Sequence, residues 1–104
     1  MSLVRSHVFI AVRLAPGSAV VPSGKRWLVK YALVYNNSGS ASASYSIQVQ
    51  PAGGTNRQVF AGTIANQVTF VLPQPITLEQ GDTLTVSSSL GTSVVAASGI
   101  EFTP

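Results

Sequence analysis

The sequence predicts an all-β fold: a single antiparallel β-sandwich, jelly-roll-like, with about eight strands. Apolar and polar residues alternate with a period of two along most of the chain, and no stretch keeps a helical period. Clusters of Gly, Pro, Asn and Ser separate the alternating segments at intervals of about 8–12 residues, a spacing typical of sandwiches. The chain has 104 residues, which is enough for one domain but not for two.

The first predicted strand covers residues 3–14 and is long for so small a domain. Its alternation places two sets of side chains on opposite faces. One face carries Val4, Ser6, Val8, Ile10, Val12 and Leu14, and the other carries Leu3, Arg5, His7, Phe9, Ala11 and Arg13. A strand of this kind can pair with a sheet edge of its own subunit or of the next one.

This first strand divides the chain into three parts within one domain. Residues 1–14 form an N-terminal strand or arm, and residues 15–24, rich in Pro, Gly and Ser, form a connection. Residues 25–104 are expected to hold the sandwich core.

Residues 26–35 give the clearest alternation and predict a central strand. Its odd-numbered residues, from Trp27 to Tyr35, are aromatic or aliphatic, whereas Arg26 and Lys30 lie on the opposite face. The next strand covers residues 45–50, and the turn-rich residues 36–42 are expected to join the two as a hairpin.

Shorter strands follow along the rest of the chain. They are expected at residues 58–62, 67–72, 76–78, 83–88, 93–96 and 100–103. The predicted core consists of Trp27, Val29, Tyr31, Leu33, Ile47, Val49, Phe70, Leu72, Leu84 and Val86.

The chain is unusual in carrying little charge. Only 9% of its residues are charged, against about 25% in ordinary soluble domains. It has one histidine, no cysteine and three acidic residues, so it lacks the groups from which catalytic and metal sites are usually built. We therefore predict that the protein is not an enzyme and uses no cofactor or metal ion.

The two nearest acidic residues, Glu79 and Asp82, are better explained by a turn than by catalysis. Gly81 can supply the positive φ that a tight turn needs, and the Asp82 carboxylate can accept hydrogen bonds from turn amides. Gly81 and Asp82 are therefore predicted to be structural turn residues.

The net charge of +3 is unevenly distributed, because all basic residues precede the acidic ones along the chain. Residues 25–31 mix bases with aromatic rings, as nucleic-acid binding strands do. Strand alternation, however, places Trp27 and Tyr31 on the face opposite Arg26 and Lys30, so nucleic-acid binding is not expected. No apolar run approaches the ~18 residues of a membrane span, and no membrane partner is predicted.

Four segments carry a resemblance to known groups of proteins. Residues 22–29 (PSGKRWLV), followed by the Asn/Ser/Gly-rich residues 36–42, resemble the start of small β-sandwich virion proteins of tailed bacteriophages. Residues 76–86 (ITLEQGDTLTV) are similar to the L-x-x-G-D-x-L turn of many jelly rolls, and a last strand that begins after Ser98-Gly99 is also found there. The resemblance covers about three-quarters of the chain.

This resemblance implies a head-decoration, cement, neck or tail accessory protein, made in the host cytoplasm and located in the virion. Its partners would be further copies of itself, in an oligomer such as a trimer, and the larger shell or tail proteins. The surface-contact candidates are Leu3, Arg5, His7, Phe9, Arg13, Arg26 and Lys30. The alternative is a β-sandwich module that binds a glycan or another surface ligand.

Overall fold

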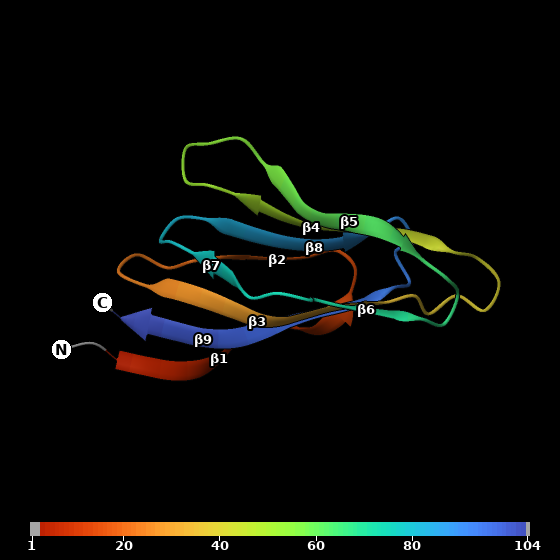
Figure 1. Cartoon of the computed structure of the whole chain (residues 1–104), viewed down its shortest axis with the longest axis horizontal. Coiled ribbons are helices and arrows are strands. Elements are labelled where there is room, and N and C mark those ends of the chain that lie inside the picture. The colour runs from red at the N-terminus through yellow and green to blue at the C-terminus, as the bar shows by residue number, and fades with distance from the viewer. Residues whose placement is uncertain (1–2, 104) are drawn as a thin grey trace.

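The structure is a computed structural model that describes residues 3–103, and it is all-β (Figure 1). Residues 3–103 contain no helix with the length and apolarity that a membrane span needs. The strands are β1 (Leu3–Leu14), β2 (Gly17–Val20), β3 (Arg26–Tyr35), β4 (Ala43–Gln50), β5 (Arg57–Ile64), β6 (Thr69–Val71), β7 (Ile76–Leu78), β8 (Thr83–Ser88) and β9 (Val94–Thr103).

These strands form two packed antiparallel sheets. The first has the order β1-β9-β3-β6, with β7 also pairing with β3, and the second has the order β2-β8-β4-β5. Because β6 and β7 occupy one position beside β3, the pairing is nested: β4 with β5, β3 with β6 and β7, β2 with β8, and β1 with β9. This nesting is the jelly-roll arrangement of eight strand positions, and it confirms the predicted fold class.

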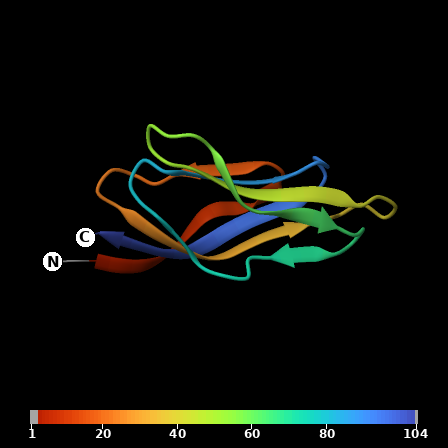
Figure 2. The ribbon, with the colours of Figure 1, turned by 45° about the horizontal axis from the view of Figure 1, so that its top comes forward.

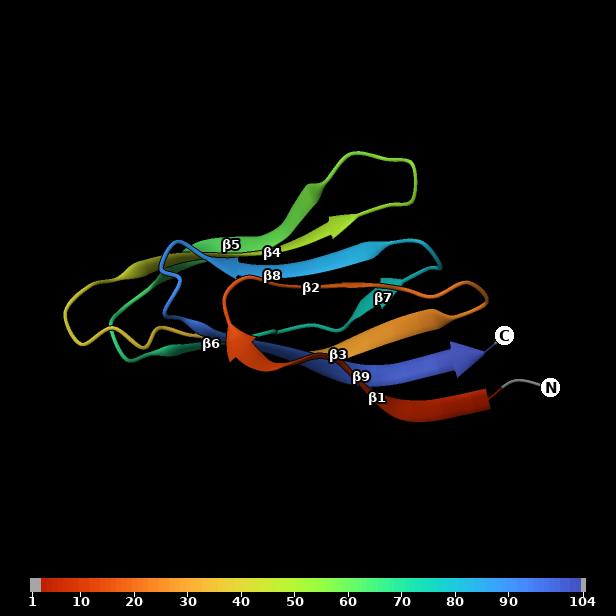
Figure 3. The same cartoon turned by 180° about the vertical axis from the view of Figure 1, so that it is seen from behind.

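The start of β1 and the end of β9 lie side by side at one end of an elongated molecule, as Figures 1 and 3 show. The loop between β3 and β4 lies at the other end (Figure 2). Several strands have the predicted bounds, namely β1, β3, β7 and β8. Two predictions of strand extent are wrong: residues 17–20, assigned to the connection, form β2, and the two last predicted strands are one continuous β9.

The predicted hairpin between residues 26–35 and 45–50 is also wrong, because β3 and β4 belong to different sheets. Asn36 explains the crossing. Its side chain is fully buried and its amide nitrogen donates hydrogen bonds to the carbonyl oxygens of Ala41 and Ile64, at 2.8 and 3.2 Å. These bonds satisfy buried carbonyls where the chain passes from one sheet to the other.

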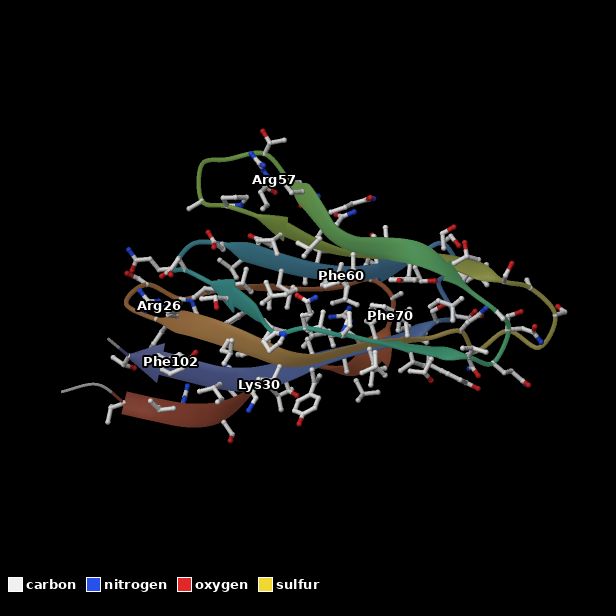
Figure 4. The ribbon with its side chains drawn as sticks, in the orientation of Figure 1. Arg26, Lys30, Arg57, Phe60, Phe70 and Phe102 are labelled. Atoms are coloured by element: carbon white, nitrogen blue, oxygen red, sulfur yellow. The ribbon has the colours of Figure 1, made fainter. Side chains whose placement is uncertain are left out.

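Most of the predicted core residues are buried, among them Trp27, Val29, Ile47, Leu84 and Val86. Leu72 is buried too, whereas Val49 and Phe70 are partly buried and pack against the core. Phe60 and Phe70 lie between the two sheets in Figure 4.

Two core predictions, Tyr31 and Leu33, are wrong because β3 contains a β-bulge. Val29 pairs with Gly99 and Tyr31 pairs with Ser98, so Lys30 is an extra residue with no partner on β9. An extra residue reverses the alternation that follows it, and Ala32 and Val34 are buried in place of Tyr31 and Leu33.

Glycine at position 99 permits this bulge. A Cβ atom there would collide with the carbonyl oxygen of Leu28 and lie 2.8 Å from the amide nitrogen of Lys30. No side chain larger than hydrogen fits where the bulged strand approaches β9 so closely.

Strand β1 pairs with β9 of the same chain and contains a bulge at the matching level. Val8 pairs with Ser98 and Ile10 pairs with Ala97, which leaves Phe9 as the extra residue. Ser98 is therefore flanked by one bulge on each side, Phe9 in β1 and Lys30 in β3.

Candidate interaction surface

The outer side of the first sheet carries a continuous apolar surface, which we call the apolar face. Its residues face away from the second sheet and line a shallow groove of about 240 Å³. The apolar face consists of Val8 and Val12 of β1, Tyr31 and Leu33 of β3, Val71 of β6 and Ala96 of β9. The exposed fraction is 74% for Val12 and 64% for Tyr31, so large apolar groups face water here.

Both bulges contribute to this surface. The bulge in β3 turns Tyr31 outward, and Val8 lies across Ser98 from it in the same row. A second, more polar hollow adjoins the groove and is lined in part by Ser6, Lys30 and Gly99. Figure 4 shows Lys30 on the outer side of the first sheet.

The outer side of the second sheet has the opposite character, and we call it the polar face. It is defined by Ser18 of β2, Ser46 and Gln48 of β4, and Thr85 and Ser87 of β8, which pair across neighbouring strands. The hydroxyls of Ser46 and Ser87 are 2.6 Å apart, and the Gln48 amide donates to the Ser46 hydroxyl at 3.1 Å. These side chains therefore form hydrogen bonds with one another and can also bond to water.

Glu101 is the most buried ionisable group, with an exposed fraction of 3%. Its Oε1 accepts hydrogen bonds from Arg5 Nε at 3.0 Å and from an Arg5 terminal nitrogen at 2.7 Å. Its Oε2 accepts a hydrogen bond from the Trp27 indole at 2.9 Å, and His7 Nε2 lies 3.9 Å away. This cluster fastens β1 to β9 and β3.

The environment of Glu101 favours its ionised form. The hydrogen bond from Trp27, together with the hydrogen bonds and the charge of Arg5, holds the pKa of Glu101 below its ordinary value of 4.5. Burial acts in the opposite direction but is outweighed. The carboxylate is a structural anion whose two oxygens are occupied by its own chain.

Glu79 and Asp82 are also engaged within the chain. Asp82 Oδ2 accepts a hydrogen bond from the Glu79 amide at 2.9 Å, and Oδ1 accepts one from the Ala52 amide at 3.2 Å. Gly81 between them has a φ of 84°, in the left-handed region that favours glycine. Gly81 and Asp82 thus form the expected turn, and the Glu79 side chain pairs with Arg26 Nε at 2.9 Å.

The predicted contact residues fall into separate places rather than one surface. Leu3 and Arg13 are exposed on β1, Arg5 and His7 face Glu101, and Arg26 pairs with Glu79. Two residues of the set, His7 and Lys30, line the hollow that adjoins the apolar face.

Phe9 is wrong as a contact residue, because its ring is buried and stacks on Trp27 with centroids 4.2 Å apart. The separation of Tyr31 from Lys30, used above against nucleic-acid binding, also fails, since the bulge exposes both residues.

The valines of the apolar face were not predicted as contact residues, although the sequence carries a signal for them. Residues 3–14 carry apolar side chains on both faces of the strand, one of which also holds Arg5, His7 and Arg13, and a strand with apolar residues on both faces is usually covered on both sides. In residues 3–103 only one side of β1 is covered by the second sheet.

No three His, Asp or Glu side chains within the described part of the chain come together as a metal site would require. Comparison with known protein families, curated protein sequences and solved structures gives no match for this chain.

Proposed function

We propose that this protein is a non-enzymatic structural subunit of a tailed-phage particle, and that it attaches to the capsid or tail lattice through its apolar face. The observation that carries the proposal is the exposure of Val8, Val12, Tyr31 and Val71 on one side of one sheet. Continuous apolar surface of this kind on a small domain is typical of a protein-binding site.

The distribution of charge supports the same proposal. All three acidic side chains are engaged within the chain, in ion pairs or in a turn, so few free carboxylates remain to oppose close contact. The centres of protein interfaces are depleted in charge in the same way. The phage origin itself rests on the resemblance of residues 22–29 and 36–42 to small virion proteins of tailed bacteriophages.

Association with further copies is part of this proposal. Strand β1 is the edge of the first sheet and spans 12 residues. An edge strand offers unpaired backbone groups that can pair with another strand, and a second copy could use this edge without covering the apolar face.

The proposal is tested on particles purified from the phage that encodes this chain. We expect mass spectrometry to detect the protein at a stoichiometric copy number in those particles. Replacing both Val8 and Val12 with Asp should remove it from the particles, because carboxylates on the apolar face oppose burial.

The control is Val20→Asp, which places one carboxylate at a comparably exposed valine in the second sheet, and it is compared with the single Val8→Asp variant as well as with the double variant. The Val20→Asp variant should be incorporated normally. Absence of the wild-type protein from the particles would refute the structural role, and equal incorporation of all variants would refute the use of the apolar face.

One observation favours the alternative of a glycan-binding module. A hollow of about 510 Å³ in the second sheet is lined by hydroxyl and amide side chains, including Gln58, Thr63 and Ser87, beside Tyr45. Glycan-array binding that is lost in the Gln58→Ala variant would support this alternative. A wild-type protein that binds no glycan on the array would remove it.

A further inference from the structure

We propose that the apolar face binds a surface of a different protein, one in which apolar side chains surround a carboxylate, and that this carboxylate pairs with Lys30. The inference rests on the proposed function and deepens it, because it states the chemistry of the partner and excludes a second copy of this chain in a face-to-face arrangement.

Lys30 is placed where any occupant of the apolar face would cover it. As the extra residue of the β3 bulge, it lies next to Tyr31 and shares a hollow with Val8, Tyr31 and Ser98, which also line the apolar groove. Within residues 3–103 its ammonium group has no acidic side chain within salt-bridge distance. Burial of an ammonium group without a partner is unfavourable, so the occupant must supply an anion or leave Lys30 in water.

A second copy of the chain is poorly equipped to supply that anion from its side chains. Glu101 is buried and bonded by Arg5 and Trp27. Asp82 accepts two backbone hydrogen bonds in its turn, and Glu79 is paired with Arg26. Two apolar faces brought together would also bury two lysines against apolar groups, which disfavours that pairing.

The size of the surface fits a protein partner. Strand β1 has 12 residues, so at about 3.3 Å per residue it is about 40 Å long, and the sheet is about 15 Å wide at about 4.8 Å per strand. The resulting area of about 600 Å² is that of the whole outer side of the sheet, of which the apolar face is a part, and it approaches the ~800 Å² that each partner buries in a standard interface. A contact of this size can hold a folded partner without a deep pocket.

The test uses a variant of the protein as the partner surface. The Lys30→Glu variant keeps the apolar face and replaces its cation with a carboxylate, which is the chemistry that the proposal assigns to the partner. Sedimentation velocity at low ionic strength compares wild type alone, Lys30→Glu alone and their equimolar mixture.

We expect the mixture to form a one-to-one complex at least tenfold more tightly than either protein associates with itself, and the preference to weaken as salt is added. Adding Val8→Asp to the Lys30→Glu partner should abolish the complex. The matched control is Arg57→Glu, on the far side of the molecule (Figure 4). It should associate with wild type no more tightly than wild type associates with itself.

Two outcomes would overturn the inference. If wild type alone associates as tightly as the mixture, and Val8→Asp prevents it, the occupant is a second copy. If the mixture shows no preference, Lys30 does not select the partner. Either result leaves the structural role in the particle intact, because that role is tested separately by the presence of the protein in purified particles.

Discussion

The outer faces of the two sheets differ in chemistry. On the second sheet, Ser46, Gln48 and Ser87 bond to one another and form a surface that is stable in water without a partner. On the first sheet, Val8, Val12 and Tyr31 project into solvent with nothing above them in this chain.

The difference shows how a chain with so little charge divides its polar and apolar side chains between two faces. Uncharged hydroxyl and amide groups keep one face hydrated, so the apolar groups can be concentrated on the other. The apolar face depends on the register shifts in β1 and β3 and on Gly99 rather than on the strand pattern alone.

The largest effect on stability is expected from adding a methyl group at a glycine of the first sheet, compared with the same change at a glycine of the second sheet. Gly99→Ala places a Cβ against the backbone of Leu28 and should reduce the free energy of unfolding by more than ~3 kcal/mol. Gly62→Ala in β5 meets only the Tyr45 side chain, at 3.0 Å, and should cost about 1 kcal/mol or less. Urea unfolding measures both, and equal losses would show that the bulge in β3 does not depend on Gly99.

A smaller effect should come from Glu101, which fastens the edge strand of the sheet that carries the apolar face. Glu101→Gln should reduce the free energy of unfolding by about 2 kcal/mol at pH 7, because charge-assisted hydrogen bonds from Arg5 and Trp27 are weakened. Since the pKa of Glu101 is lowered on folding, its contribution is complete above pH 4.5 and is lost as the pH falls below that value.

Urea unfolding of wild type and Glu101→Gln at pH 7 and at pH 3 measures this pH dependence, and the difference between them should shrink at pH 3. The matched control is Glu79→Gln, which removes the exposed pair with Arg26 and should change stability by less than ~0.5 kcal/mol. A difference between wild type and Glu101→Gln that is the same at both pH values would contradict the assignment.

The smallest effect on stability is expected from substitutions that give each face the chemistry of the other. Val8→Thr with Val12→Thr, and separately Thr85→Val on the polar face, should each change the unfolding free energy by less than ~0.5 kcal/mol, because these side chains are at the surface. Solubility in ammonium sulfate should rise for the first variant and fall for the second. A change of the same sign in both would mean that the faces do not differ as described.

Several parts of the fold could be predicted from the sequence because they depend on local patterns. The alternation of residues 26–29 placed Trp27 in the core, and the Gly81-Asp82 turn is specified by its own residues. The bounds of β1, β3, β7 and β8 follow from alternation and from the turn residues that flank them.

The rest could not be predicted because it depends on contacts between distant residues. The bulge at Lys30 needs Gly99 on another strand, and one extra residue exchanged Tyr31 for Ala32 in the core. The Arg5–Glu101 pair joins residues 96 positions apart, which no local pattern reveals. Strand β2 is short and lies in a segment whose Pro and Gly content is typical of a loop.

The antiparallel pairing of β1 with β9 has a mechanical consequence, since the start of one strand lies beside the end of the other (Figure 3). Tension applied at these two ends would unzip the ladder one residue pair at a time instead of shearing many hydrogen bonds together. The third pair to be separated is Arg5 with Glu101, whose side-chain hydrogen bonds resist the separation near its start. The strength of the Arg5–Glu101 pair, rather than the size of the core, would set the force at which β1 separates from β9.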